Sequence, residues 1–200
     1  MTRPPLRSAF EWEDELPRLE TSRLVLRHPK PTDSSDLFAV FSDPEVMRYW
    51  SDLPMSTPQD ADGYIAQIDA HFHDRDLFQW AAEQRTTARV IGTCTLLNVS
   101  AAHQRAEIGF ALGRQHWGQG LATEIVNALL SFAFETLALH RLEADVDPRN
   151  ERSLRLLERL GFLREGHLRE RYFVGGERQD SVLLALLRRD WQAPRESRAD

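Results

Sequence analysis

Two glycines, Gly118 and Gly120, separate a strand-like run at residues 106–112 from a long amphipathic helix. The helix repeats apolar side chains at helical spacing from Leu121 to Leu137. The first turn of a helix has backbone N–H groups without intrahelical partners, and it has partial positive charge. Glycines let an anion approach these groups without a Cβ in the way. The junction therefore suits a phosphate or a pyrophosphate.

The residues after the glycines exclude two familiar phosphate-binding motifs. A P-loop requires Gly-Lys-Ser/Thr, whereas Gly120 is followed by Leu121 and Ala122. The dinucleotide fingerprint requires a third glycine, and Thr123 stands in its place. For this pattern by itself, a plain strand-to-helix turn remains an open alternative.

Composition limits the possible partners and compartments. The chain has 200 residues, enough for one domain with a sizeable core, and its formal net charge of -6 argues against nonspecific nucleic-acid binding. No apolar stretch is long enough to span a membrane and no signal-peptide core is present, so we expect no membrane partner and a cytoplasmic location. Cys94 is the single cysteine, which excludes an intrachain disulfide and a cysteine zinc site, and we expect no metal.

Periodicity and turn residues predict alternating strands and helices in one domain at residues 19–191. The expected strands are 19–27, 77–83, 89–98, 105–112, 140–146, 162–173 and 179–187. The expected helices are 34–41, a short one after Asp43-Pro44, 57–74, 121–137 and 151–160. Residues 1–18 show no periodicity and are expected to form a loose extension, and residues 192–200 a polar tail.

The glycine motif and a second block resemble the signatures of one enzyme superfamily. The motif Gln115-x-x-Gly118-x-Gly120 is similar to the Q/R-x-x-G-x-G/A signature of the GNAT N-acetyltransferases. The second block resembles that superfamily's N-x-x-[AS]-x(3)-Y-E-K-x-G-F pattern. It reads Asn150-x-x-Ser153-x(3)-Leu157-Glu158-Arg159-Leu160-Gly161-Phe162.

Two N-terminal stretches narrow the resemblance to the ribosomal-protein-alanine N-acetyltransferase-like subfamily, the RimJ/RimL type. They read Thr21-x-Arg23-Leu24-x-Leu26-Arg27 and Asp43-Pro44-Glu45-Val46-Met47-Arg48-Tyr49. The resemblance implies an α/β (α+β) acyl-CoA N-acyltransferase fold, with a mixed central sheet of about seven strands and flanking helices. It also implies a splayed central pair of strands at residues 107–112 and 141–146.

The resemblance implies that acetyl-CoA is the cosubstrate and that it lies in the gap between the splayed strands. Its pyrophosphate would meet the N–H groups of the glycine turn, and its pantetheine arm would pair with the strand before the turn. A backbone N–H there would stabilise the developing oxyanion. The cofactor-binding residues expected on this basis are Phe110, Ala111, Leu112, Gln115, Gly118, Gln119, Gly120, Leu121, Ala122, Thr123, Asn150 and Ser153.

The implied chemistry is direct attack of an amine on the thioester, after a carboxylate has removed the amine's proton. Glu107 and Asp145 lie on the two central strands and are the candidate bases. The superfamily often places a tyrosine acid where this chain has Leu157, so Ser153, or Tyr172 from a late strand, is the candidate substitute.

The acceptor is expected to be a primary amine: a protein N-terminus, an amino-acid derivative or a small amine. Tyr49 and Trp50 are candidate walls of its pocket, together with Glu107, although packing of the two aromatics into the core is an equal alternative. The protein is expected to be a monomer or a homodimer. The alternative function is a non-catalytic acyl-CoA-binding or regulatory module, and Leu157 is the feature that favours it.

Overall fold

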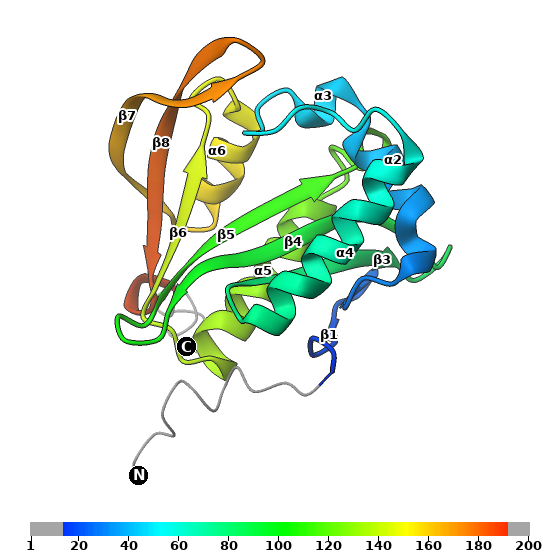
Figure 1. Ribbon diagram of the computed structural model, residues 1–200. Helices are drawn as coiled ribbons and strands as arrows, with labels where there is room; N and C mark the ends of the chain where they lie inside the picture. The colour runs from blue at the N-terminus through cyan, green and yellow to red at the C-terminus, as the bar shows by residue number, and fades with distance from the viewer. Residues whose placement is uncertain (1–13, 192–200) are drawn as a thin grey trace.

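The computed structural model describes residues 14–191, which form an eight-stranded mixed sheet with helices on both faces (Figure 1). The strand order is β1-β2-β3-β4-β5-β6-β8-β7, and β5 and β6 are the parallel pair among antiparallel neighbours. The strands are β1 (Leu19–Glu20), β2 (Leu24–Arg27), β3 (Leu77–Gln84), β4 (Arg89–Ser100), β5 (Arg105–Leu112), β6 (Arg141–Val146), β7 (Leu163–Val174) and β8 (Glu177–Leu187).

The helices cover the sheet in two groups. Figure 1 shows α4 across one face and α5 behind the opposite one. The α-helices are α2 (Ser34–Phe41), α3 (Pro44–Met47), α4 (Pro58–Asp74), α5 (Leu121–Ser131) and α6 (Glu151–Arg159). Two 3-10 turns, η1 (Pro31–Asp33) and η2 (Arg114–His116), and a π-helical turn, η3 (Phe132–Thr136), complete the set.

The expected mixed sheet is confirmed, with eight strands instead of seven. The predicted strand 19–27 is interrupted by a turn in which Thr21 N donates to Leu24 O at 3.0 Å, which separates β1 from β2. All four residues of β2 are buried. The predicted helix 121–137 is α-helical only to Ser131 and then widens into the π-turn η3.

The expected loose extension is wrong at its end. Leu16 is 3% exposed and belongs to the main core, and Trp80 Nε1 donates to Pro17 O at 2.8 Å. The rest of the predicted extension, residues 1–13, and the predicted tail, residues 192–200, lie outside the described residues. Within residues 14–191, no helix combines the length and apolarity needed to cross a membrane.

The parallel pair β5–β6 separates along its length, which confirms the expected splay. The two strands are paired from Arg105 opposite Arg141 to Glu107 opposite Glu143, and β5 then continues to Leu112 without β6. On its other side β5 stays paired with β4 as far as Leu112, and β6 stays paired with β8 along its whole length. Because both strands are held by these outer neighbours, the gap between them is a fixed feature of the sheet.

Candidate active site

Two cavities meet at the gap between β5 and β6. We name them by charge: the acidic cavity, of about 810 Å³, and the basic cavity, of about 1010 Å³. The residues that line both are Tyr49, Trp50, Phe110, Asn150 and Ser153. A ligand in one cavity can therefore touch a ligand in the other across this junction.

The glycine turn forms one wall of the basic cavity. Gly118 and Gly120 have φ angles of 74° and 77°, a region that residues with a Cβ rarely adopt. A Cβ placed on Gly118 would meet no atom within 4 Å, so the backbone there faces open space. The first hydrogen bond of α5 is from Glu124 N to Gly120 O at 3.1 Å, which leaves the three preceding helical N–H groups without intrahelical partners. The turn thus presents free amides and a helix N-terminus, which together bind anions.

Arginine side chains dominate the rest of the basic cavity. Six arginines line it, compared with two carboxylates, Glu45 and Glu151. The six are Arg48, Arg114, Arg149, Arg152, Arg155 and Arg159. Three of the six form ion pairs with carboxylates: Arg149 with Asp147 at 2.6 Å, Arg155 with Glu151 at 2.6 Å and Arg48 with Glu45 at 3.6 Å. The remaining excess of positive charge fits a ligand that carries several phosphate charges.

The Trp117 side chain is hydrogen-bonded to the last residue of β5. Its Nε1 donates to Leu112 O at 2.6 Å, and the Arg152 guanidinium lies 5.0 Å from its ring centroid. This contact ties the turn to the strand that precedes it.

The edge of β5 that faces the gap has free main-chain groups. Gly113 N donates to Ile91 O at 2.8 Å, which sets the alternation of hydrogen bonds along the antiparallel pair β4–β5. By this alternation Ile108 and Phe110 direct their N–H and C=O groups away from β4, toward β6. The last pair with β6, Glu107 opposite Glu143, uses Ile108 N–H, so Ile108 C=O and both main-chain groups of Phe110 lie beyond the pairing. These groups can bind an extended ligand as an added strand would.

Ten of the twelve expected cofactor-binding residues line the basic cavity, and Gln115 and Gln119 do not. Gln119 Nε2 donates to Gln115 O at 3.0 Å, so these two residues close the turn on itself. Contact of these two residues with a ligand stays a prediction, and the hydrogen bond between them stabilises the turn.

The acidic cavity carries six carboxylates, and none of the described residues that line it is an arginine, a lysine or a histidine. The six are Asp52, Asp60, Glu107, Asp145, Asp147 and Asp180. Asp145 and Asp147 are paired with arginines outside the cavity, Arg171 and Arg149. Apolar side chains, among them Leu77 and Leu97, lie between the charges. The cavity is therefore suited to an organic cation.

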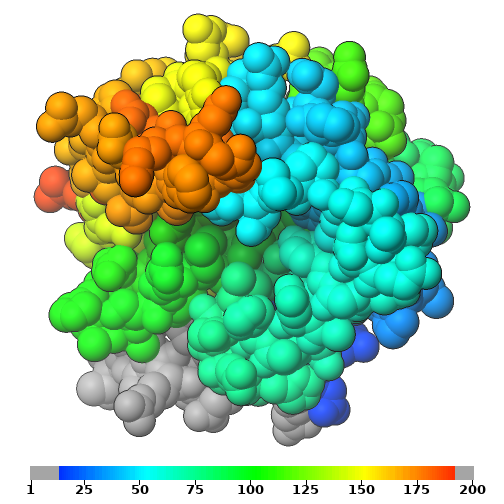
Figure 2. All heavy atoms as spheres, turned by 45° about the horizontal axis from the view of Figure 1, so that its top comes forward, coloured from blue at the N-terminus to red at the C-terminus, as the bar shows by residue number. Residues whose placement is uncertain are grey.

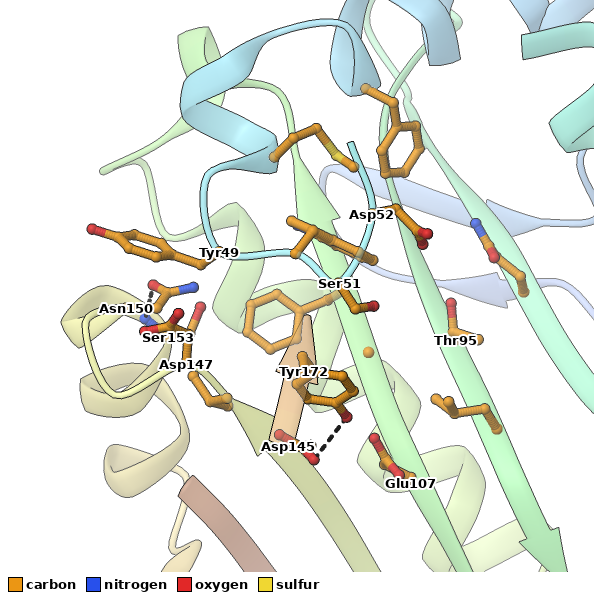
Figure 3. Close-up of a pocket in the computed structure, with 18 of the residues that line it drawn as sticks. Tyr49, Ser51, Asp52, Thr95, Glu107, Asp145, Asp147, Asn150, Ser153 and Tyr172 are labelled. Atoms are coloured by element: carbon orange, nitrogen blue, oxygen red, sulfur yellow. Dashed lines mark hydrogen bonds between the residues drawn. The ribbon is translucent and has the colours of Figure 1, made fainter. Parts of the chain in front are cut away.

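Glu107 lies on β5 within the acidic cavity (Figure 3). Burial raises the pKa of its carboxyl above the ordinary value, and a hydrogen bond from Asn98 Nδ2 to Oε2, at 2.9 Å, offsets this only in part. Asn98 has a left-handed φ of 51° beside the irregularity in β4, and this conformation turns its amide toward Glu107. A carboxylate with a raised pKa and few donors around it is a good proton acceptor.

Asp145 is held by three donors. Arg171 Nε lies 2.8 Å from Oδ2, Tyr172 OH donates to Oδ2 at 3.0 Å, and Ser181 Oγ donates to Oδ1. Three donors therefore surround the Asp145 carboxylate, whereas Glu107 accepts one side-chain hydrogen bond, from Asn98, and is more open to a substrate amine. Burial raises the pKa of the Tyr172 phenol, which therefore stays protonated. Figure 3 shows the Tyr172 hydroxyl directed at Asp145.

The start of α6 brings Asn150 and Ser153 to the junction. Asn150 is the N-cap of the helix, and its side chain accepts from Ser153 N at 3.2 Å. Ser153 lines both cavities, whereas Tyr172 lines the acidic one. Leu157 is fully buried and also borders the acidic cavity, where it offers no proton.

Tyr49 and Trp50 lie at the junction and line both cavities. Trp50 packs edge-to-face on Phe41, with ring centroids 5.9 Å apart, and the Arg149 guanidinium lies 5.9 Å from the Tyr49 ring centroid. The sequence left open whether these aromatics line a pocket or pack into the core. Trp50 does both, because it packs on a smaller core cluster and also lines the cavities.

The sequence did not single out Asp52, Asp60, Asp180 or Asn98, which come together only in three dimensions. Asp52 lies between α3 and α4, and Asp180 lies near the start of β8. Figure 2 shows the end of the β7–β8 hairpin, in orange, against the segment between α3 and α4, in cyan. An asparagine inside a strand was the available signal for Asn98, because asparagine is depleted in strands and tolerates a left-handed conformation. Among residues 14–191, no group of three His, Cys, Asp or Glu side chains could hold a metal ion.

In a comparison with known protein families, residues 23–163 match the acetyltransferase (GNAT) domain. An uncharacterized N-acetyltransferase of Bacillus subtilis (strain 168), YoaA, is 35% identical over 172 residues, which cover 86% of this chain and 97% of the relative. A spermidine N(1)-acetyltransferase of Vibrio cholerae is 28% identical and covers 83% of this chain and 94% of its own. The crystal structure of spermidine N-acetyltransferase from Vibrio cholerae in complex with CoA and spermine has a TM-score of 0.75, at 26% identity, over 86% of this chain and 99% of that one.

Proposed function

Because the chain belongs to the acetyltransferase (GNAT) domain family, we propose that its two joined cavities transfer acetyl from acetyl-CoA to a cationic primary amine. The chain is an acetyl-CoA-dependent N-acetyltransferase, which sets aside the alternative of a non-catalytic module. The proposal is carried by the junction of a basic cavity with an acidic one at the point where β5 and β6 separate.

The basic cavity fits the phosphates and the extended arm of acetyl-CoA. The free amides from Gly118 to Thr123 suit the diphosphate, and the excess of arginine charge suits the further phosphate. The open edge of β5 at Phe110 suits an extended amide-containing arm. When bound, acetyl-CoA supplies a thioester whose carbonyl carbon is open to attack by an amine.

Glu107 is the general base in this proposal. An alkyl ammonium has a pKa of about 10.4 and must lose a proton before it can attack a carbonyl carbon. The Glu107 carboxylate, with its raised pKa, takes this proton directly or through one water. Asp145, held by Arg171 and Tyr172, serves to position the Tyr172 ring in the cavity wall.

Ser153 is the proposed donor of a hydrogen bond to the departing thiolate, because it lines both cavities at their junction. We expect Ser153→Ala to lower kcat about tenfold, since a proton or hydrogen bond to the leaving group is then lost. Tyr172→Phe is expected to change kcat by about twofold, because its hydroxyl already donates to Asp145. Thiol release at saturating substrates measures both. A larger loss for Tyr172→Phe would assign the donor to Tyr172 instead.

The acceptor proposed is an aliphatic amine that carries a second positive charge. Asp52, Asp60, Glu107 and Asp180 line the acidic cavity, and the described residues offer none of them an ion pair with arginine or lysine. Asp60 accepts from Ser56 N and Thr57 N, and Asp180 accepts from Glu170 N and pairs with His167, so these two carboxylates are partly engaged. If Glu107 receives the proton of the reacting amine, Asp52 is the carboxylate best placed to hold a second cation, and the charges of Asp60 and Asp180 add to the attraction. The apolar side chains between the charges suit a chain of methylene groups.

Diamines are therefore expected to exceed monoamines of equal chain length by about tenfold in kcat/KM. Asp52, which Figure 3 shows at the cavity, is the carboxylate to test. Asp52→Asn should remove much of this preference, while Asp62→Asn, an equal charge change on α4 outside the cavity, should retain it.

The assay is thiol release from acetyl-CoA with diamines, monoamines, amino-acid amides and peptides with a free N-terminus. Equal rates for diamines and monoamines would contradict the second cation site. Faster reaction with peptides than with diamines would indicate a protein N-terminus as the acceptor, as in the ribosomal-protein-alanine acetyltransferases. Binding of acetyl-CoA without turnover of any amine would contradict the whole proposal.

A further inference from the structure

Glu124, in the first turn of α5, accepts four hydrogen bonds from the segment between β1 and β2. Its Oε1 accepts from Thr21 Oγ1 at 2.5 Å, from Arg23 N at 2.8 Å and from Ser22 Oγ at 3.1 Å. Its Oε2 accepts from Arg23 Nε at 2.7 Å. These contacts join parts of the chain about a hundred residues apart. They give a structural reason for the Thr-x-Arg motif, whose residues line neither cavity.

Arg23 also reaches the glycine turn. Its Nη1 donates to Gln119 O at 2.9 Å, and its Nη2 lies 3.6 Å from the place that a Cβ on Gly120 would occupy. A trans peptide is planar, and its C=O and N–H groups point in opposite directions. By holding Gln119 O, the guanidinium therefore fixes the direction in which Gly120 N–H points.

The two sides of this peptide face different surroundings. Gly120 lines the basic cavity, whereas Arg23 does not. With Gln119 O held on the side of Arg23, the opposite side of the peptide, which carries Gly120 N–H, is available to the cavity. Arg23 is thus placed to act on a ligand through the turn, without touching the ligand.

Glu124 keeps its charge under working conditions. Burial favours the neutral acid, but the hydrogen bonds from Thr21, Arg23 and Ser22 outweigh it and lower the pKa of Glu124 to about 2. The Glu124 side chain is only 14% exposed, compared with 48% for Arg23. A charged carboxylate in the first turn of α5 also interacts favourably with the helix dipole.

We infer that Arg23 and Glu124 form a clamp that holds the glycine turn in its diphosphate-binding conformation, with Arg23 as a positioning residue for the cosubstrate. The inference rests on the proposed function of the basic cavity. It predicts that loss of the clamp weakens only those ligands that carry the diphosphate, because the acidic cavity and the edge of β5 do not depend on it.

The test compares two acyl donors, acetyl-CoA and S-acetylpantetheine, which lacks the diphosphate. Arg23→Ala is expected to raise KM for acetyl-CoA about tenfold with kcat little changed, and to leave kcat/KM for S-acetylpantetheine within about twofold. Calorimetry with CoA should show the same tenfold rise in Kd. Glu124→Gln, which keeps the shape of the side chain and removes its charge, should give a smaller rise of the same kind.

Arg85→Ala is the matched control. Arg85 holds the same segment, through Thr21 O at 3.0 Å and Glu20 Oε2 at 2.9 Å, without reaching the turn, and its loss should leave CoA affinity unchanged. The clamp would be overturned if Arg23→Ala lost kcat/KM equally with both acyl donors, or if Arg85→Ala weakened CoA binding as much as Arg23→Ala does.

The Kd for CoA separates the clamp from the proposed function. If the unsubstituted protein did not bind CoA, the proposed function itself would be overturned. If the unsubstituted protein and Arg23→Ala bound CoA equally well, the clamp alone would be overturned.

Discussion

Replacement of Glu107 by glutamine is expected to lower kcat by about 10²- to 10³-fold, the usual loss when a general base is removed. The substitution keeps the size of the side chain and its hydrogen bond with Asn98, which lies 2.9 Å from Oε2. What it removes is the charge that accepts the proton of the ammonium. The fall in kcat should therefore come without a comparable loss of acetyl-CoA affinity, which calorimetry can check.

The pH profile tests the role of Glu107 independently of the size of the loss. Burial raises the pKa of Glu107, and the base works only when ionised, so activity of the unsubstituted enzyme should fall as the pH drops through that raised pKa. In Glu107→Gln the limb set by the Glu107 carboxyl should be replaced by a longer one, in which activity rises about tenfold per pH unit up to the pKa of the amine, because only amine already neutral in solution reacts.

Glu143→Gln supplies the control. Glu143 lies directly beside Glu107 in the β5–β6 register, but it pairs with Arg105 and Arg141 and does not line the acidic cavity. Its kcat should stay within about threefold of the unsubstituted value. If Glu107→Gln kept full activity and the pH profile of the unsubstituted enzyme, Glu107 would be excluded as the base, and Asp145→Asn would be the next substitution.

Local patterns in the sequence predicted the parts of the site that depend on local structure. The glycine turn and the strand before it are contiguous, so their residue types alone indicated an anion site at a helix N-terminus. Glu107 was found because it lies on a predicted central strand. The fold followed in the same way, because strands and helices alternate with clear turn residues between them.

The parts that the sequence missed depend on contacts between distant segments. Arg23 and Glu124 carry no local sign that they meet, and the interruption between β1 and β2 that brings them together was itself read as continuous strand. Asp52 and Asp180 approach the same cavity from the loop before α4 and from β8. The role of Asn98 required knowledge of a backbone irregularity that periodicity does not reveal.

The division of charge between the cavities follows from which elements border the gap. The basic cavity is bordered by α6, whose exposed positions carry arginines, while the acidic cavity is bordered by the loop before α4 and by the start of β8. The anionic cosubstrate and the cationic acceptor are thus drawn to opposite sides of one junction. Added salt should weaken both interactions, because exposed charges are screened beyond about 10 Å at 0.1 M ionic strength.

Replacement of Gly118 by valine is expected to raise Kd for CoA about 100-fold, because two effects act together. A β-branched residue is strained at a φ of 74°, at a cost of about 1–3 kcal/mol. In addition, the new side chain would fill the open space of the basic cavity in which the diphosphate is proposed to lie. Calorimetry with CoA measures the loss.

Gly176→Val separates these two effects. Gly176 has a similar φ of 89°, and a Cβ placed on it also meets no atom within 4 Å, but it lies in the β7–β8 turn and lines neither cavity. The strain should lower the melting temperature of both variants by a similar amount, and only Gly118→Val should lose CoA affinity beyond about twofold. Equal affinities for CoA in the two variants would mean that the glycine turn does not bind the diphosphate. The assignment of the basic cavity to acetyl-CoA would then be wrong, because it rests on that contact.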